Sequence, residues 1–445
     1  MKTRTILPGP AAVLTGALLL GFLWRVRGTH GWGSSWGVLA AGFVFTLFLT
    51  AAAARKNRPP MRLIALASLS FMLTAPAWGT LLGQITGILG GSPEGAAPTY
   101  ISPAQGALFM ALMGFGLAGM FGVLLGRCFT DRPWRLRDYI VVLAVFLIVF
   151  YGMKATLAHP LVKLLSPQAT DAFRQGLAEA GIAKTPFAAY LSYFNAEGWA
   201  KKIAGGRHYY ACVSAISSAA GAAAAICAAR FFAKDRFAAK TGAVVCGAFA
   251  FSITAADLFF FFGNGGYRGT QGFSLPQNFA AWSLWEYFTG FIAGGIITFF
   301  ILRAAPAQAV GEPLISKLPE KPQSVLSFLL VCIGAVGLNA VRPMLVRTDE
   351  TPYSVWFAVA AGVATLGLCV LMCRKCGFCF RDAGASLPAV LCAAFTLYFA
   401  ALYFFAGSPE IKNMGMLHNI LAAVSAVFCT GTGVWPPLKN RTRSG

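Results

Sequence analysis

Apolar stretches of about 20 residues recur along the whole chain and are separated by short polar segments. As a helix, such a stretch crosses the roughly 30 Å of hydrocarbon in a bilayer. The stretches are too long for barrel strands and lack their alternation of apolar and polar residues. We therefore expect an all-α polytopic membrane protein. Twelve transmembrane helices are predicted, at 10–26, 34–54, 62–82, 104–126, 139–158, 210–232, 242–263, 279–302, 324–346, 352–373, 387–406 and 416–436.

The composition excludes a soluble globular protein. Of the 445 residues, 57% are apolar and 11% are charged, whereas soluble domains have about 25% charged residues. The net charge of +21 raises the question of nucleic acid, but the cations lie between the apolar spans and do not form one basic face. We therefore expect no nucleic-acid partner.

The cations also predict the orientation of the chain. If the N-terminus is cytoplasmic, 23 of the 36 Lys and Arg residues fall in inner segments, as the positive-inside rule requires. This topology places both termini in the cytoplasm and the protein in the plasma (inner) membrane. The apolar run of the first span continues into Trp24, Arg25 and Arg27 without a small-residue cleavage pattern, so it is predicted to be a retained signal anchor.

One hexapeptide occurs twice. Arg27–Trp32 reads RGTHGW and Arg268–Phe273 reads RGTQGF, after the first and the seventh predicted spans. Six helices separate the two copies, so a duplication would give two parallel six-helix halves, 1–240 and 241–445, related by an axis along the membrane normal. The alternative is two unrelated tight turns in a glycine-rich chain.

Twelve helices in two parallel sets of six resemble the broad architecture of the major facilitator superfamily. The loop 55–60 after the second span lacks the Gly-x3-Asp-Arg signature of that superfamily. The longest loop also lies between spans five and six and not at the centre of the chain. The resemblance therefore implies an architecture and does not imply a function.

The long outer segment 159–209 is the main difference between the halves. Residues 172–180 and 186–199 have helical spacing, which predicts helices lying in the outer membrane interface. Long loops of this kind are often functional, so the segment is expected to be a lid over a site or a simple cap. Its aromatic residues gather on one side: Phe187, Tyr190, Tyr193 and Phe194.

Ionisable residues at membrane depth are costly and therefore point to function. Only two acids, Asp257 and Glu286, lie within predicted spans, each about 9 Å below the outer end at 1.5 Å per residue. Either could instead be a structural counter-ion to an arginine. Cationic and hydrogen-bonding residues are predicted on the same side of the membrane: Arg25, Arg27, His30, Lys154, Arg268, Asn339, Arg342, His418 and Asn419.

Cations outnumber acids in this set, which favours an anionic ligand, although Arg25, Arg27 and Arg268 could simply extend to the interface. We expect a secondary transporter of a small organic anion, coupled to protons or another ion. The predicted substrate-binding residues are Arg27, His30, Arg268, Asn339, Arg342 and Asn419. The predicted coupling residues are Asp257, Glu286 and His418, because low dielectric raises the pKa of a carboxyl group.

Two alternatives stay open. One is an outer-leaflet transferase acting on a lipid or lipid-linked substrate, with Glu286, Asp257 or His30 as the general base, so whether the chain is an enzyme is undecided. The other is a structural or sensory membrane protein. The expected partners are membrane lipids and the anionic or lipid-linked substrate.

Motifs for other chemistry are absent or weak. The sequence has no phosphate-binding Gly-x4-Gly-Lys-Ser/Thr loop, no Gly-x-Ser-x-Gly elbow and no His-Glu-x-x-His, and no cofactor is expected. The spacing of Cys369, Cys373, Cys376 and Cys379 makes them weak metal-ligand candidates; four reduced thiols is the simpler interpretation. Small residues such as Gly114, Gly116 and Gly119 are expected to permit close helix packing.

Overall fold

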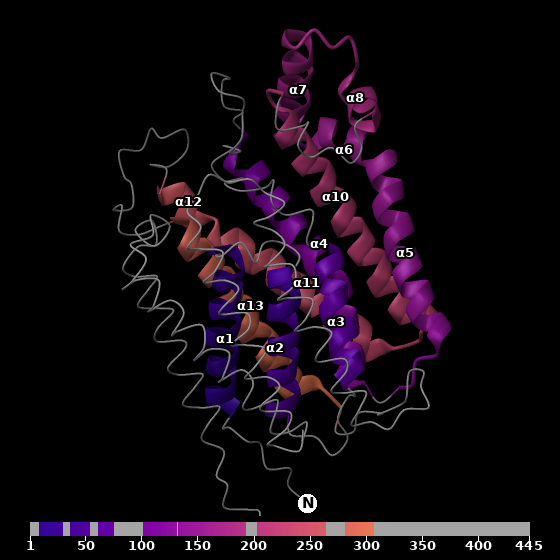
Figure 1. Cartoon of the computed structure of the whole chain (residues 1–445), viewed down its shortest axis with the longest axis vertical. Coiled ribbons are helices and arrows are strands. Elements are labelled where there is room, and N and C mark those ends of the chain that lie inside the picture. Colours follow the sequence, from indigo (N-terminus) through magenta and orange to yellow (C-terminus); the bar gives the residue numbers. More distant parts are fainter. Residues whose placement is uncertain are drawn as a thin grey trace, which may run out of the picture. The chain divides into compact units, whose positions relative to one another are not determined.

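A computed structural model of the chain describes residues 9–29, 36–53, 61–74, 101–130, 132–192, 203–263 and 281–306, and every regular element in these ranges is helical (Figure 1). The helices are α1 Gly9–Thr29, α2 Trp36–Ala52, α3 Met61–Thr74, α4 Pro103–Phe129, α5 Leu136–Ala155, α6 Ala158–Leu165, α7 Pro167–Glu179, α8 Pro186–Ser192, α10 Gly206–Cys227, the π-helical turn η2 Ala228–Phe232, α11 Arg236–Ala256, α12 Leu258–Gly263 and α13 Ala281–Ala304.

Five of these helices are long and apolar enough to cross a membrane: α4, α5, α10 with η2, α11, and α13 from Leu284. Each of the first eight predicted spans coincides with a described helix. The prediction of a helical, multi-pass membrane protein is therefore confirmed in its coarse form. The last four predicted spans lie outside the described residues, so the total of twelve and the halves 1–240 and 241–445 stay predictions.

The helix boundaries differ from the predicted ones where polar residues occur. Helix α11 begins at Arg236, six residues earlier than predicted, because the Asp235 carboxylate caps it by accepting the Ala238 N–H over 2.8 Å. The predicted continuous helix 242–263 is divided at Asp257 into α11 and α12, although the backbone hydrogen bonding continues. Helix α1 extends to Thr29, so Arg27 to Thr29 form its last turn and not the expected loop.

The chain divides into two compact units, one comprising Met1–Met72, Leu124–Pro133 and Gly290–Gly445, the other Leu73–Val123 and Trp134–Thr289. In the first unit, small residues bring α1 and α13 together. Gly290 lies against Leu20 and Gly294 against Gly16, in antiparallel order. Such contacts let two helix backbones approach closely, which is a main source of helix association in lipid.

In the second unit, glycines of α4 contact two other spans. Gly116 lies on Ser218 and Gly119 on Ala222 of α10, while Gly114 lies on α11. A methyl group on any of the three would overlap the neighbouring helix. The predicted close packing of span four through these glycines is thus confirmed.

Helices α6, α7 and α8 form a cap at the end of α5 and α10, at the top of Figure 1. Two glycines allow close contact between the cap and the segment before α10. Gly176 of α7 lies against Ala204, and Gly205 lies against Ala172. Gly205 has a positive φ of 69°. A polar contact adds to these, because the Gln105 side-chain amide of α4 donates to the Leu165 carbonyl oxygen over 3.0 Å. The cap is therefore a packed element.

Candidate functional site

The structure describes only part of the predicted site. The side chains of Asp257 and Glu286 are described, as are those of Arg25 and Lys154, whereas for Arg27 only the backbone is described. The other predicted site residues lie outside the described ranges: His30, Arg268, Asn339, Arg342, His418 and Asn419, together with Cys369, Cys373, Cys376 and Cys379.

Asp257 and Glu286 are both deeply buried, with exposed fractions of 0% and 1%. Asp257 follows the last residue of α11, and its backbone continues the helical hydrogen bonding, with its N–H donating to the Ile253 carbonyl over 3.0 Å and its own carbonyl accepting from Phe261 over 3.1 Å. Glu286 lies in the second turn of α13, within an aromatic stretch. Two carboxyl groups in one compact unit are therefore held away from the surface.

An aromatic contact shows that the two carboxyl groups come from adjacent elements. The rings of Phe259 in α12 and Phe288 in α13 stack with centroids 5.1 Å apart. Each ring is two residues beyond one of the carboxyl groups, Asp257 or Glu286. Residues two apart point to different sides of a helix, so the stack shows that the two elements are neighbours and does not measure the separation of the carboxyl groups.

A second polar cluster lies where the cap meets α5 and α10, and sequence reasoning missed it. The His159 ring is 5% exposed, with Nδ1 2.8 Å from the Tyr209 hydroxyl and Nε2 2.9 Å from the Lys154 carbonyl oxygen. A carbonyl oxygen only accepts, so Nε2 donates to it and, in the neutral ring, Nδ1 accepts from Tyr209. His159 thus satisfies one of the end carbonyls of α5, which have no partner within the helix.

The environment of His159 keeps the ring neutral. Burial lowers its pKa from the ordinary 6.5, and the hydrogen bond to the Lys154 carbonyl opposes this only in part. The ring also meets Phe187 and Tyr190 edge to face, with centroids 4.7 Å and 4.8 Å away. Burial likewise raises the pKa of Tyr190, with the Tyr210 and Tyr209 side chains adding to the shift. These groups are therefore uncharged at neutral pH.

Lys154 is the predicted cation that this cluster contains. Its side chain is 6% exposed, and Nζ donates to the Tyr210 hydroxyl over 3.1 Å. The ammonium also lies over the Phe150 and Tyr210 rings, 5.4 Å and 4.9 Å from their centroids. Cation–π and hydroxyl contacts of this kind compensate in part for removing an ammonium group from water.

A pocket of about 350 Å³ opens between the helices of the cap. His159 and Tyr209 form part of its wall, and two cationic residues, Lys163 and Arg174, line it. None of the described residues that line it is acidic. The remaining lining residues are Thr156, Pro160, Thr170, Thr185, Pro186 and Phe187. The size is at the lower end of the range for ligand pockets, about 300 to 1,000 Å³.

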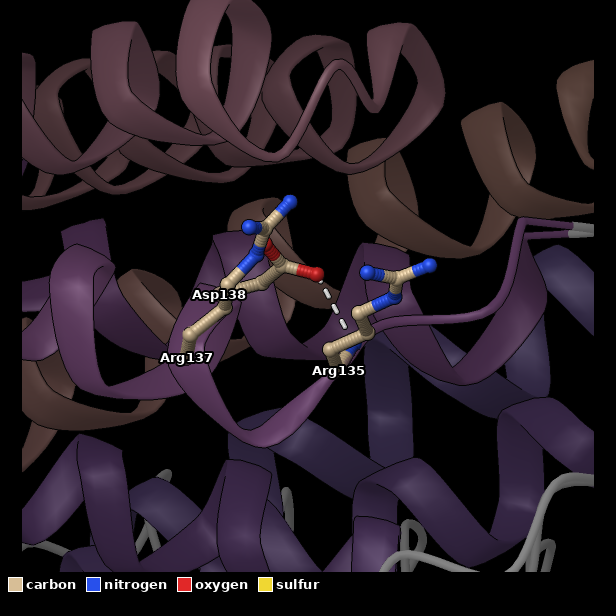
Figure 2. A network of polar contacts seen from close by, with 3 residues as sticks. All are labelled: Arg135, Arg137 and Asp138. Atoms are coloured by element: carbon tan, nitrogen blue, oxygen red, sulfur yellow. Dashed lines mark hydrogen bonds and ion pairs between the residues drawn. The ribbon is translucent and has the colours of Figure 1, made fainter.

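The opposite end of α5 carries a different polar network. The Trp134 indole N–H donates to the Asp235 carboxylate over 2.8 Å and so joins the α4–α5 turn to the start of α11. At the start of α5, the Arg135 N–H donates to the Asp138 carboxylate over 2.7 Å, and the Arg137 guanidinium is 3.7 Å from it (Figure 2). These two turns are rich in cations: Arg127, Arg132, Arg135, Arg137, Arg230, Lys234, Arg236 and Lys240.

No cluster of three or more His, Cys, Asp or Glu side chains suited to a metal ion occurs among the described residues. Four cysteines lie in this part of the chain, Cys128, Cys212, Cys227 and Cys246, and all four are free thiols. Neither metal nor disulfide chemistry therefore explains the two polar clusters.

Comparisons with known proteins give no relative: no protein-family model, no curated protein and no solved structure matches the chain.

Proposed function

We propose that the protein is a secondary transporter of a small organic anion, coupled to protons or to another ion. The observation that carries the proposal is the pair of buried carboxyl groups, Asp257 and Glu286, in adjacent apolar elements. An acid at membrane depth costs several kcal/mol unless it is paired or faces a water-filled cavity, so such residues usually belong to an ion or substrate pathway.

The helical backbone is continuous through Asp257, so its carboxyl side chain, and not a broken helix, is the feature suited to ion coupling. Acidic and histidine side chains within membrane spans form the proton relays of many transporters. Asp257 and Glu286 are therefore suited to carry the coupling proton, together with His418. The anion would be bound by Arg27, His30, Arg268, Asn339, Arg342 and Asn419.

The proposed topology has twelve spans in two parallel halves, with both termini in the cytoplasm and the protein in the plasma membrane. The cation-rich turns at the Trp134 end of α5 support this orientation, because cytoplasmic turns carry the excess of Lys and Arg. The cap formed by α6 to α8 is then on the outer side, and so are Asp257 and Glu286.

A second candidate function is an outer-leaflet transferase acting on a lipid or lipid-linked substrate. The position of the pocket beside α5 favours the transferase. Helix α5 is the least buried of the five candidate spans: 22% of its apolar window is buried, against 78% for α4. A substrate with an acyl chain could therefore reach the cap sideways from the lipid. In this function, Glu286, Asp257 or His30 would be the general base.

The experiment that separates the two functions measures the thermal stability of the purified protein with small organic anions, nucleotide sugars and phospholipids. A ligand that binds the folded state raises its stability by mass action. Transport predicts stabilisation by a soluble anion in the wild type, with loss of the effect in Glu286→Gln and Arg268→Ala. Stabilisation by lipids or lipid-linked compounds alone would favour the transferase, and an effect unchanged in both variants would contradict the proposed site.

A further inference from the structure

Two cationic side chains line the pocket in the cap. Lys163 and Arg174 line it, and the described lining residues include no Asp or Glu. Arg174 forms an ion pair of 3.1 Å with Asp171, but the two side chains are 59% and 64% exposed. Such exposed pairs contribute little to stability, so Arg174 can exchange Asp171 for an anionic ligand at small cost.

A buried hydroxyl group lies behind the same wall. Thr170 lines the pocket and is 6% exposed, and its Oγ1 has no hydrogen-bond partner among the described residues. The hydroxyl oxygen is closed off from water. A ligand in the pocket therefore meets the exposed cations and not this hydroxyl group.

The local helix geometry adds to the positive potential. Thr170 lies in the first turn of α7, which begins at Pro167 and has no acidic residue in that turn. The N-terminal end of a helix carries a partial positive charge and favours anions. His159 plays no direct part in binding, because both of its ring nitrogens are engaged by Tyr209 and Lys154.

Two exposed leucines lie next to lining residues in the sequence. Leu157 and Leu164 are 60% and 75% exposed, and each is the chain neighbour of a lining residue, Thr156 or Lys163. Exposed leucines beside lysine are typical of a segment at the membrane interface. The pocket is therefore placed to receive a group from the level of the lipid headgroups as well as from water.

We propose that this pocket binds a phosphate group, carried by a lipid headgroup or by a small organic molecule, through Lys163 and Arg174. Arg and Lys are the usual partners of phosphate, and charge-assisted hydrogen bonds to it are about twice as strong as neutral ones. The volume of about 350 Å³ suits a headgroup and not a whole lipid. The site is distinct from Asp257 and Glu286, so it goes beyond the proposed transport function.

The test uses the full-length protein in two arms. In the soluble arm, phenyl phosphate and glycerol 3-phosphate are titrated in detergent, with sulfate at equal ionic strength as reference. In the lipid arm, the protein is placed in nanodiscs of phosphatidylglycerol or phosphatidylcholine, each doped with a little spin-labelled phosphatidylglycerol. The readouts are the melting temperature in the soluble arm and, in the lipid arm, the fraction of labelled lipid immobilised by the protein.

Three variants isolate the site. Lys163→Gln with Arg174→Gln removes both charges. Thr170→Val keeps the shape of the side chain and removes only the hydroxyl. Lys184→Gln is the matched control, because Lys184 is an exposed cation of the same cap that donates to Ser192 and is not a pocket-lining residue. All four side chains are replaced by groups of similar size, so the fold is preserved.

In at least one arm, we expect phosphate compounds to bind the wild type and Lys184→Gln equally. Thr170→Val should leave binding unchanged, because the hydroxyl is closed off from the pocket, and the double variant should weaken binding by about tenfold for each lost charged contact. A response in only the lipid arm identifies a headgroup, and a response in only the soluble arm identifies a free organophosphate. The proposal is overturned if neither arm exceeds its reference, sulfate or phosphatidylcholine, or if the double variant binds like Lys184→Gln.

Discussion

Nδ1 of His159 accepts a hydrogen bond from the Tyr209 hydroxyl over 2.8 Å, which joins two residues separated by 50 positions in the sequence. In this direction the bond requires the neutral ring, because a protonated ring has no acceptor nitrogen and would instead donate to the hydroxyl oxygen. The direction of this contact between the cap and α10 therefore depends on the protonation state of one side chain.

The first prediction is that the cap loosens at acidic pH. Burial lowers the pKa of folded His159 below the ordinary 6.5, so the opened cap binds a proton more readily than the closed one. The stability of the cap is then fully present above about pH 6.5 and is lost as the pH falls below that value. Amide exchange of α6 and α8 at pH 7, 6 and 5, corrected for the intrinsic rates, should show opening increase by up to about tenfold per pH unit.

His159→Gln is the control for this pH effect. Its side chain does not titrate, so the corrected exchange of the cap should change little between pH 7 and 5 while being faster than in the wild type at pH 7. An equal pH dependence in the variant would assign the effect to a group other than His159.

The second prediction concerns the Trp134–Asp235 bond. Asp235 is 2% exposed, caps α11 and accepts from the indole. Asp235→Ala removes both hydrogen bonds and should lower the free energy of unfolding by about 2 kcal/mol, measured by denaturant titration in mild detergent. Asp235→Asn keeps one of the two acceptor oxygens and places an amide NH2 opposite the other donor, so it should cost less than Asp235→Ala but lose one of the two hydrogen bonds. Equal losses in the two variants would show that Asp235 stabilises the fold through its charge and not through its hydrogen bonds.

The third prediction compares two glycine-to-alanine changes in spans of the same unit. A methyl group on Gly116 would overlap Ser218, whereas Gly247 in α11 has open space around its Cα. Gly116→Ala should lower the melting temperature, because α4 and α10 must move apart. Gly247→Ala should leave it unchanged or raise it slightly, since alanine favours the helix by about 1 kcal/mol. A tolerated Gly116→Ala would refute the close α4–α10 contact.

The sequence predicts the helical spans well because their signal is local. Apolar runs such as the one in α4 identify a helix without knowledge of its neighbours, and glycines such as Gly116 indicate close packing directly. The ends are harder to predict. The predicted span starts at 242, after the charged residues Arg236 and Lys240. The helix itself starts at Arg236, and the residue before it, Asp235, is a capping residue that is visible in the sequence.

The His159 cluster was not predicted because its contacts are not local. His159 and Tyr209 are far apart in the sequence, and all of the eight-residue helix α6 except Ala158 lies in the predicted outer segment 159–209. The available signal was a histidine just after one span and two tyrosines, Tyr209 and Tyr210, at the start of the next. Two antiparallel spans bring such positions together at one end, so polar side chains at consecutive span ends are candidates for a shared site.

The most direct test of the proposed function measures proton movement in proteoliposomes that contain a pH-sensitive dye. A panel of small carboxylates and phosphate esters is added outside to the wild type, Asp257→Asn and Glu286→Gln, with melting curves to verify folding. The account predicts that at least one anion drives proton movement in the wild type and that each variant lowers the rate by tenfold or more, by analogy with the loss of a buried charged contact. Wild-type rates in both folded variants, or no anion-driven movement above empty liposomes, would contradict proton-coupled transport through these two carboxyl groups.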